Sequence, residues 1–220
     1  MTQFAKFISF VCHPIFIPLV SFLCYIQIVH YDVKAILELT TGQFWMMIIP
    51  LIVIFTVLLP LLGMNSMVSF GIIPDFKLEN HKHRPPVILW SAAMMGGLIY
   101  AFKHLEAQAN FSMFGEFYGV MFGGIAVAII TAGISYFWQI SMHLTCVSGL
   151  AGAMVALSIV LFPIGNMASI IFMNSILLLA VGLTGFSRLY LKKHNLMQVL
   201  AGIVVGFGVE FTVLVKGWYF

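Results

Sequence analysis

Long apolar segments separated by short polar islands make up most of this 220-residue chain. Several of the segments reach the roughly twenty residues that an α-helix needs to cross a hydrocarbon core about 30 Å thick. They lack the alternation of a barrel strand, which leaves the α-helix as the form that satisfies its own backbone inside a membrane. The predicted segments are residues 7–29, 44–64, 87–102, 117–138, 144–162, 167–186 and 196–215. The pattern predicts an all-α, polytopic membrane bundle of six to seven transmembrane helices.

Two short features refine this prediction. Pro14 and Pro18 remove backbone donors from the first segment, so we expect a kinked or partly broken helix there. Residues 163–166 have room only for a tight turn, which predicts that the fifth and sixth segments form a hairpin.

Composition supports a single integral-membrane domain over residues 1–220. The chain is 62% hydrophobic and only 8% charged, whereas soluble domains carry about 25% charged residues. A formal net charge of +3 is too small to indicate a nucleic-acid partner. The three cysteines all lie in apolar stretches, which favours packing over disulfides or metal ligation. No cleavable signal peptide is evident, and we expect a bacterial cytoplasmic membrane protein without cofactor or metal.

Three polar islands interrupt the apolar sequence, at residues 77–86, 139–143 and 187–198. Two predicted spans separate the first island from the second, and two more separate the second from the third. If each segment crosses once, all three islands emerge on the same membrane face and can form one site. A literal count of basic residues would place this face in the cytoplasm. The count is nearly balanced once Lys77, Arg84 and Arg188 are assigned to the site, so the orientation stays open.

The islands contain arginines and histidines, which suit phosphate chemistry. A guanidinium binds a planar oxyanion through two parallel N–H donors, and an imidazole can act as nucleophile or acid near neutral pH. Taken alone, the island around Arg188 and His194 is equally compatible with a basic loop whose side chains reach the lipid headgroups.

The order and spacing of the islands make the interpretation more specific. The three patterns are Lys77, six residues, Arg84-Pro85; Ile140-Ser141-Met142-His143; and Ser187-Arg188, five residues, His194, three residues, Gln198. They resemble the three signature motifs of the type-2 phosphatidic acid phosphatase family, the lipid-phosphate phosphatases related to vanadium haloperoxidases. The family's second motif is Pro-Ser-Gly-His, so this chain replaces its proline and glycine. Gly202 also suits the usual continuation of the third motif.

The resemblance implies a mechanism and a role for each residue. His194 would be the nucleophile that forms a phosphohistidine, and His143 would protonate the leaving group and later activate water. Fixed cations and hydroxyls would stabilise the charge on the transferring phosphoryl group. The implied phosphate-binding residues are Lys77, Arg84, Ser141, Ser187 and Arg188.

Gln198 departs from the family, which has an aspartate at this position. A glutamine oxygen can accept the same N–H from His194 and preserve the orientation and tautomer of the ring. It adds no negative charge, so we expect a slower or differently tuned enzyme, with an inactive relative as the alternative.

The resulting hypothesis is hydrolysis of a lipid phosphate or diphosphate of the polyprenyl diphosphate, phosphatidic acid, phosphatidylglycerol phosphate or lipid A type. The alternatives are a non-catalytic lipid-phosphate binder or transporter, and a lipid phosphotransferase. Three other features receive simpler interpretations. His13 is expected to be packed or interfacial, Glu210 to reach the interface from a helix end, and His81 with His83 to lack the third ligand of a metal site.

Overall fold

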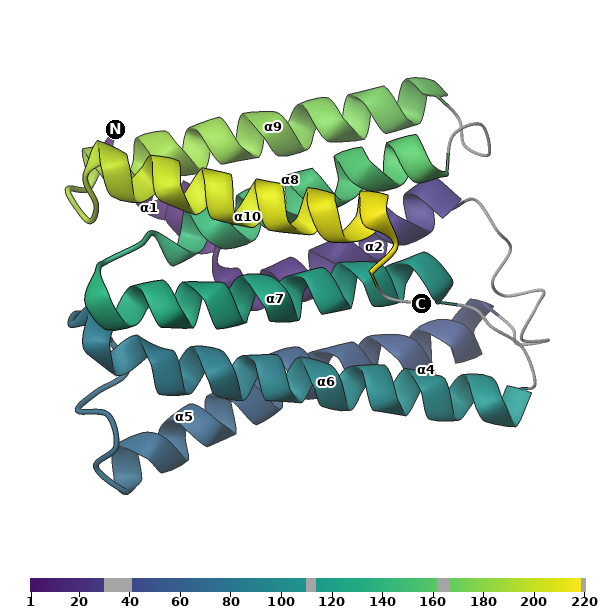
Figure 1. The fold of residues 1–220 in the computed structure, drawn as a ribbon, viewed down its shortest axis with the longest axis horizontal. Coiled ribbons are helices and arrows are strands. Elements are labelled where there is room, and N and C mark those ends of the chain that lie inside the picture. The colour runs from purple at the N-terminus through teal and green to yellow at the C-terminus, as the bar shows by residue number, and fades with distance from the viewer. Residues whose placement is uncertain (30–40, 110–113, 162–166, 219–220) are drawn as a thin grey trace.

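The computed structural model describes residues 1–29, 41–109, 114–161 and 167–218, which form a bundle of long helices lying side by side (Figure 1). The helices are α1 (Thr2–Val11), α2 (Ile17–Val29), α4 (Thr41–Val53), α5 (Leu59–Ser69), α6 (Arg84–Ala109), α7 (Gly115–Phe137), α8 (Met142–Val160), α9 (Met167–Tyr190) and α10 (Leu196–Lys216). Seven helical stretches of the described chain are long and apolar enough to cross a membrane. The predicted all-α membrane bundle is confirmed.

The first two spans, which contain prolines in their interiors, are interrupted. α1 ends at Val11, a 3-10 helix follows at Pro14–Phe16, and α2 begins at Ile17. His13 has the extended backbone (φ −70°, ψ 136°) that a residue before proline prefers, so the predicted break is confirmed. The second span contains Pro50 inside α4 and passes through a π-helical turn at Ile54–Leu58 before α5. Such turns inside helices often accompany functional sites.

The tightest packing in the bundle lies between α8 and α10. A Cβ atom at Gly206 would collide with the carbonyl oxygen of Thr145, so the two backbones approach each other directly. The Ser148 hydroxyl donates to the Gly202 carbonyl across this contact (3.2 Å). Because α8 is also largely buried among other helices, the starts of α8 and α10 hold fixed positions relative to each other.

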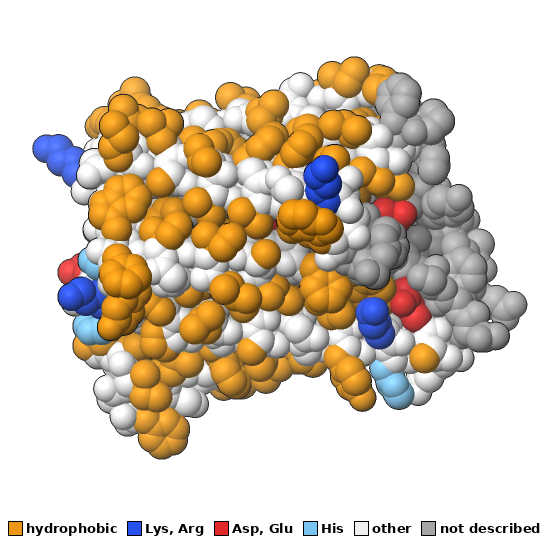
Figure 2. All heavy atoms as spheres, in the orientation of Figure 1, with side chains coloured by type: hydrophobic (Ala, Val, Ile, Leu, Met, Phe, Trp, Pro, Cys, Tyr) orange, Lys and Arg blue, Asp and Glu red, His pale blue; other side chains and the backbone are white. Residues whose placement is uncertain are grey.

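The outer surface is apolar, as a lipid-facing surface should be. Phe10, Phe172 and Val204 are each at least 66% exposed. Figure 2 shows hydrophobic side chains covering most of the length of one face, with charged side chains mainly toward its ends. Exposed apolar area on this scale is typical of a protein whose solvent is the bilayer.

The three polar islands lie at one end of the bundle. Figure 1 shows the α5–α6, α7–α8 and α9–α10 connections together at the left. This is the arrangement that counting the predicted spans indicated. The hairpin turn predicted at residues 163–166 lies outside the described residues.

Candidate functional site

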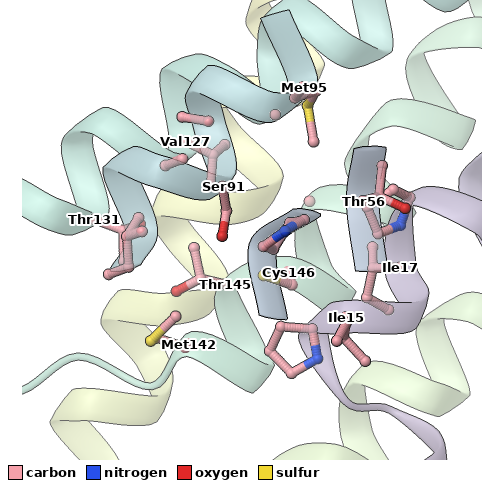
Figure 3. Close-up of a pocket in the computed structure, with 18 of the residues that line it drawn as sticks. Ile15, Ile17, Thr56, Ser91, Met95, Val127, Thr131, Met142, Thr145 and Cys146 are labelled. Carbon is pink, nitrogen blue, oxygen red and sulfur yellow. The ribbon is translucent and has the colours of Figure 1, made fainter. Parts of the chain in front are cut away.

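A cavity of about 410 Å³ opens between the helices and is lined by residues from all three islands. The end of the cavity nearest the three islands, its polar end, is lined by cationic and imidazole side chains. Deeper between the helices the cavity walls are mostly apolar. Figure 3 shows part of these walls, with Thr56, Ser91 and Met95 among the side chains around the space. The chemistry-bearing residues at the polar end are His13, Lys77, Arg84, His143, Arg188 and His194.

The loop before α6 wraps around the Arg84 side chain. Asp75 Oδ1 accepts the backbone N–H groups of Lys77 (2.8 Å) and Leu78 (3.2 Å). This turn places Leu78 at φ +49°, a left-handed conformation uncommon for leucine. The Leu78 carbonyl then accepts from Arg84 Nε at 3.0 Å. The first island therefore folds locally so that the backbone holds the guanidinium in place.

Arg84 also connects the first island to the second. Its Nη1 donates to the Ile140 carbonyl and its Nη2 to the Glu79 carbonyl, both at 3.5 Å. A guanidinium has five N–H donors, so two remain for a ligand after these bonds. The geometry is that of a fixed cation with donors to spare.

Arg188 lies in the last turn of α9 and is partly paired. Its Nη1 donates to the Ser9 hydroxyl of α1 at 2.8 Å. Its Nε is buried and has no hydrogen-bond partner among the described residues. A buried donor of this kind gains from an anionic ligand, because an unpaired buried polar group is costly.

Neither of the two predicted serines is among the residues that line the cavity. Ser187 is fully buried and donates its hydroxyl to the Ala5 carbonyl at 2.6 Å. The structure therefore does not bring Ser187 to the cavity, and its hydroxyl ties α9 to α1 instead. The Ser141 hydroxyl is buried without a partner in the described chain, and the Ser141 N–H donates to the Gln198 carbonyl at 3.3 Å, which links the second island to the third.

Gln198 orients His194 at the start of α10. Its Oε1 lies 3.1 Å from His194 Nδ1 and also 3.1 Å from the Asn195 backbone nitrogen, which donates to it. The Asn195 side chain accepts from the Gln198 N–H at 2.9 Å, which completes a capping box. Since Oε1 only accepts, Nδ1 carries the proton and Nε2 is left with its lone pair free. This is the contact that the sequence predicted for the glutamine.

Electrostatics keeps the His194 ring neutral. Burial lowers the pKa of His194 to about 4, and the positive charges of Arg188 and Arg84 act in the same direction. The hydrogen bond that His194 donates to Gln198 opposes this shift without cancelling it. A neutral imidazole with a free Nε2 is the form that can attack phosphorus.

His143 and His13 form a pair of rings beside this group. His143 is the second residue of α8, and its ring centroid lies 5.2 Å from that of His13 at an interplanar angle of 87°. His13 Nδ1 accepts the Ile15 N–H at 3.3 Å, and the break before Pro14 brings the ring to the cavity. His13 is packed, as expected from the sequence, but that expectation did not place it at the cavity. The signal was a histidine placed directly at a proline break inside an apolar segment.

Glu210 corrects a second expectation. The sequence interpretation placed it near a helix end with access to the interface. In the structure Glu210 is only 5% exposed and lines the inner part of the cavity. Its neighbours include Cys146 of α8 and glycines of α7 and α8, which leave room for the carboxyl group.

Within the described residues, no group of three or more His, Cys, Asp or Glu side chains could hold a metal ion. His81, half of the His-x-His pattern, instead places its Nδ1 2.7 Å from the Ser135 carbonyl. Comparisons with family models, with curated proteins and with solved structures gave no match. The motifs and the geometry of the cavity are therefore the features that bear on function.

Proposed function

We propose that this integral membrane protein is a phosphatase that hydrolyses a lipid phosphate or diphosphate through a phosphohistidine on His194. One observation carries the proposal. His194 lines a cavity together with Arg84, Arg188 and His143, and Gln198 accepts a hydrogen bond from its Nδ1. A structural histidine has no need for an orienting partner on one nitrogen and a cationic cavity on the other side.

The first half-reaction follows from these positions. His194 Nε2 attacks phosphorus, an N–P bond forms, and the bond from phosphorus to the lipid oxygen breaks. The bound phosphate anion favours the protonated form of His143. His143 gives this proton to the departing oxygen, so the lipid leaves as an alcohol or, from a diphosphate, as a monophosphate. Arg84 and Arg188 stabilise the charge on the equatorial oxygens without having to reorganise.

The second half-reaction restores the protein. Neutral His143 takes a proton from water, the water oxygen attacks phosphorus, and the N–P bond breaks to release inorganic phosphate. His143 is then protonated again and His194 is neutral. The balance is one lipid phosphate and one water consumed, with one dephosphorylated lipid and one phosphate produced.

The cavity also supports the choice of a lipid substrate. Its polar end lies at the end of the bundle where the islands meet, and its walls continue between the helices as side chains such as Ile88, Met95 and Val127. A phosphate can therefore bind near headgroup level while its hydrocarbon chain remains in apolar surroundings. We also propose that this membrane is a bacterial cytoplasmic membrane.

One observation favours a second candidate, a lipid-phosphate binder or transporter. Gln198 holds His194 without supplying the negative charge that would stabilise an imidazolium-like phosphohistidine. A cavity built for binding alone needs the cations and the hydrogen bonds but not that charge.

Phosphate release by the purified protein in detergent distinguishes these candidates. The panel contains a polyprenyl diphosphate, phosphatidic acid, phosphatidylglycerol phosphate and a lipid A phosphate, each with His194→Ala as the control. Release by the wild type and not by the variant supports the phosphatase. Binding of a lipid phosphate with no release by either protein supports the binder, and transfer of phosphate to an added lipid alcohol in preference to water supports a phosphotransferase.

A further inference from the structure

The inner part of the cavity contains an ionisable group that the phosphatase mechanism does not use. Glu210 lies on α10, and its Oε2 is buried without a hydrogen-bond partner in the part of the chain that the structure describes. A carboxyl group in this position is costly, because no donor of the described chain offsets the burial of this oxygen.

The surrounding helices make room for this carboxyl group. A Cβ atom at Gly123 of α7 would collide with Glu210 Oε2, and one at Gly149 of α8 would lie 3.4 Å from Glu210 Cγ. Met95 of α6 lies close to Gly124 and lines the same region of the cavity. The glycines admit the carboxyl group without providing a side chain to pair with it.

The distance between Glu210 and the phosphate end can be taken along the helix. Gln198 and Glu210 are twelve residues apart on α10, which corresponds to about 18 Å along the axis at the α-helical rise. The cavity lining on α6 runs from Arg84 to Leu98, a separation of about 21 Å by the same rise. The lengths estimated along α10 and along α6 are similar, and both are long enough for an extended hydrocarbon chain.

We infer that the lipid bound here carries a hydrogen-bonding group, such as a hydroxyl or an amide, on its chain about 18 Å from phosphorus, where it pairs with Glu210. This inference rests on the proposed function for the position of the phosphate. A plain saturated chain would leave the carboxyl group unpaired, whereas a hydroxyl or amide both donates and accepts and can therefore satisfy it. The substrate class becomes an amphiphilic phosphate with a polar group within its apolar part.

Two positional isomers of a long-chain alkyl phosphonate test the inference by binding alone. In one isomer a hydroxyl lies about 18 Å from phosphorus in the extended chain, and in the other it lies next to the phosphonate. The isomers have the same composition but partition differently into detergent, so the ratio of their affinities is compared between the wild type and its variants. The wild type should bind the first isomer about fivefold to tenfold more tightly, the value of one buried hydrogen bond.

Variants of α10 assign the preference to the carboxyl group. Glu210→Leu should bind both isomers equally, and Glu210→Gln should keep the preference because the amide retains a donor and an acceptor. Thr212→Leu is the matched control, since Thr212 is exposed on the same helix. A ratio of two affinities does not depend on the fraction of protein that is folded, which keeps the test valid for a less stable variant.

Several results would overturn the inference: equal affinities in the wild type, a preference that survives Glu210→Leu, or no binding of either phosphonate. Its failure is distinct from failure of the proposed function. Phosphate release from the lipid panel without any isomer preference would reject only the role of Glu210. Isomer preference without phosphate release would reject only the phosphatase.

Discussion

The two ends of the cavity differ in how their polar groups are supported. At the outer end, Arg84 and His194 are held by hydrogen bonds that they donate to a loop carbonyl and to the Gln198 side chain of the helix cap. At the inner end, Glu210 is accommodated by packing against glycines, and its Oε2 has no partner in the described chain. The outer end has the preorganised donors that charge stabilisation requires. The inner end has an unsatisfied group, which is typical of a place that a ligand completes.

This contrast predicts different kinds of damage at the two ends. Substitutions at the outer end should lower the rate of the chemical step, since its groups act on the transferring phosphoryl group. Substitutions at the inner end should change which lipid hydrocarbon chain the cavity binds. Measuring kcat and KM separately resolves the two effects.

The largest effect is expected from the two proposed catalytic histidines. His194→Ala removes the atom that attacks phosphorus and His143→Ala removes the proton donor, so each should abolish phosphate release. The measurement is single-turnover release, with circular dichroism and size-exclusion chromatography showing that the helices and the fold remain. Near-normal release by either variant would be incompatible with the mechanism.

A smaller but still large effect is expected at the arginines. Arg84→Lys and Arg188→Lys keep the charge but lose the forked donors, and losses on the order of a hundredfold in kcat/KM would fit. Lys82→Ala is the matched control for Arg84, because Lys82 lies in the same island but does not line the cavity. Similar losses for Lys82→Ala and Arg84→Lys would show that the motif register is wrong.

Gln198 should have a moderate effect. Gln198→Leu removes the acceptor for His194 Nδ1 and should lower phosphate release roughly tenfold, the scale on which loss of an orienting partner acts. Gln198→Asp should preserve or raise release, because a carboxylate would add charge stabilisation to the same contact. The expected change lies in kcat more than in KM.

Asn195→Ala provides the control for helix capping. Gln198→Leu also removes half of the capping box, and Asn195→Ala removes the other half while leaving the contact between Gln198 and His194 in place. The alanine variant should therefore lose about 1 kcal/mol of helix stability and keep its phosphate release. If Gln198→Leu matches the wild type in release, the glutamine does not orient the nucleophile.

Sequence reasoning anticipated the bundle and much of the outer end of the cavity. Apolar length determined the helices, and the spacing of Lys77, Arg84, His143, Arg188 and His194 indicated which residues share a site. These features depend on local sequence or on the number of spans between two positions. Both can be read from one amino-acid sequence. The position of the Ser187 hydroxyl could not be predicted in this way. Whether it faces the cavity or the Ala5 carbonyl depends on where α1 packs.

The inner end was beyond sequence reasoning for a related reason. A glutamate inside an apolar segment can face lipid, a neighbouring helix or a cavity, and helical periodicity does not choose among them. The choice depends on Gly123 and Gly149, which come from two other helices. His13 likewise became a cavity residue through the geometry of the break before Pro14, which proline content predicted only as a kink.

The smallest expected effect concerns the titration of His194. Its pKa of about 4 means that the ring stays neutral from pH 8 to pH 5 and takes up a proton only below that range. Protonation of the nucleophile should therefore cause no loss of kcat/KM across that interval. Arg188→Met removes a positive charge that lowers the pKa, so the pKa should rise in this variant. Gln198→Leu removes a hydrogen bond that raises the pKa, so the pKa should fall further.

Nuclear magnetic resonance of protein labelled at histidine tests these directions, with the His194 signal assigned by its absence from the spectrum of His194→Ala. The ring shifts of the wild type should remain those of a neutral imidazole at pH 5. Since the two substitutions move the pKa in opposite directions, a general loosening of the site would not reproduce the pair of results. A wild-type midpoint near the ordinary histidine value of about 6.5 would mean that the ring is more exposed to solvent than the cavity geometry indicates.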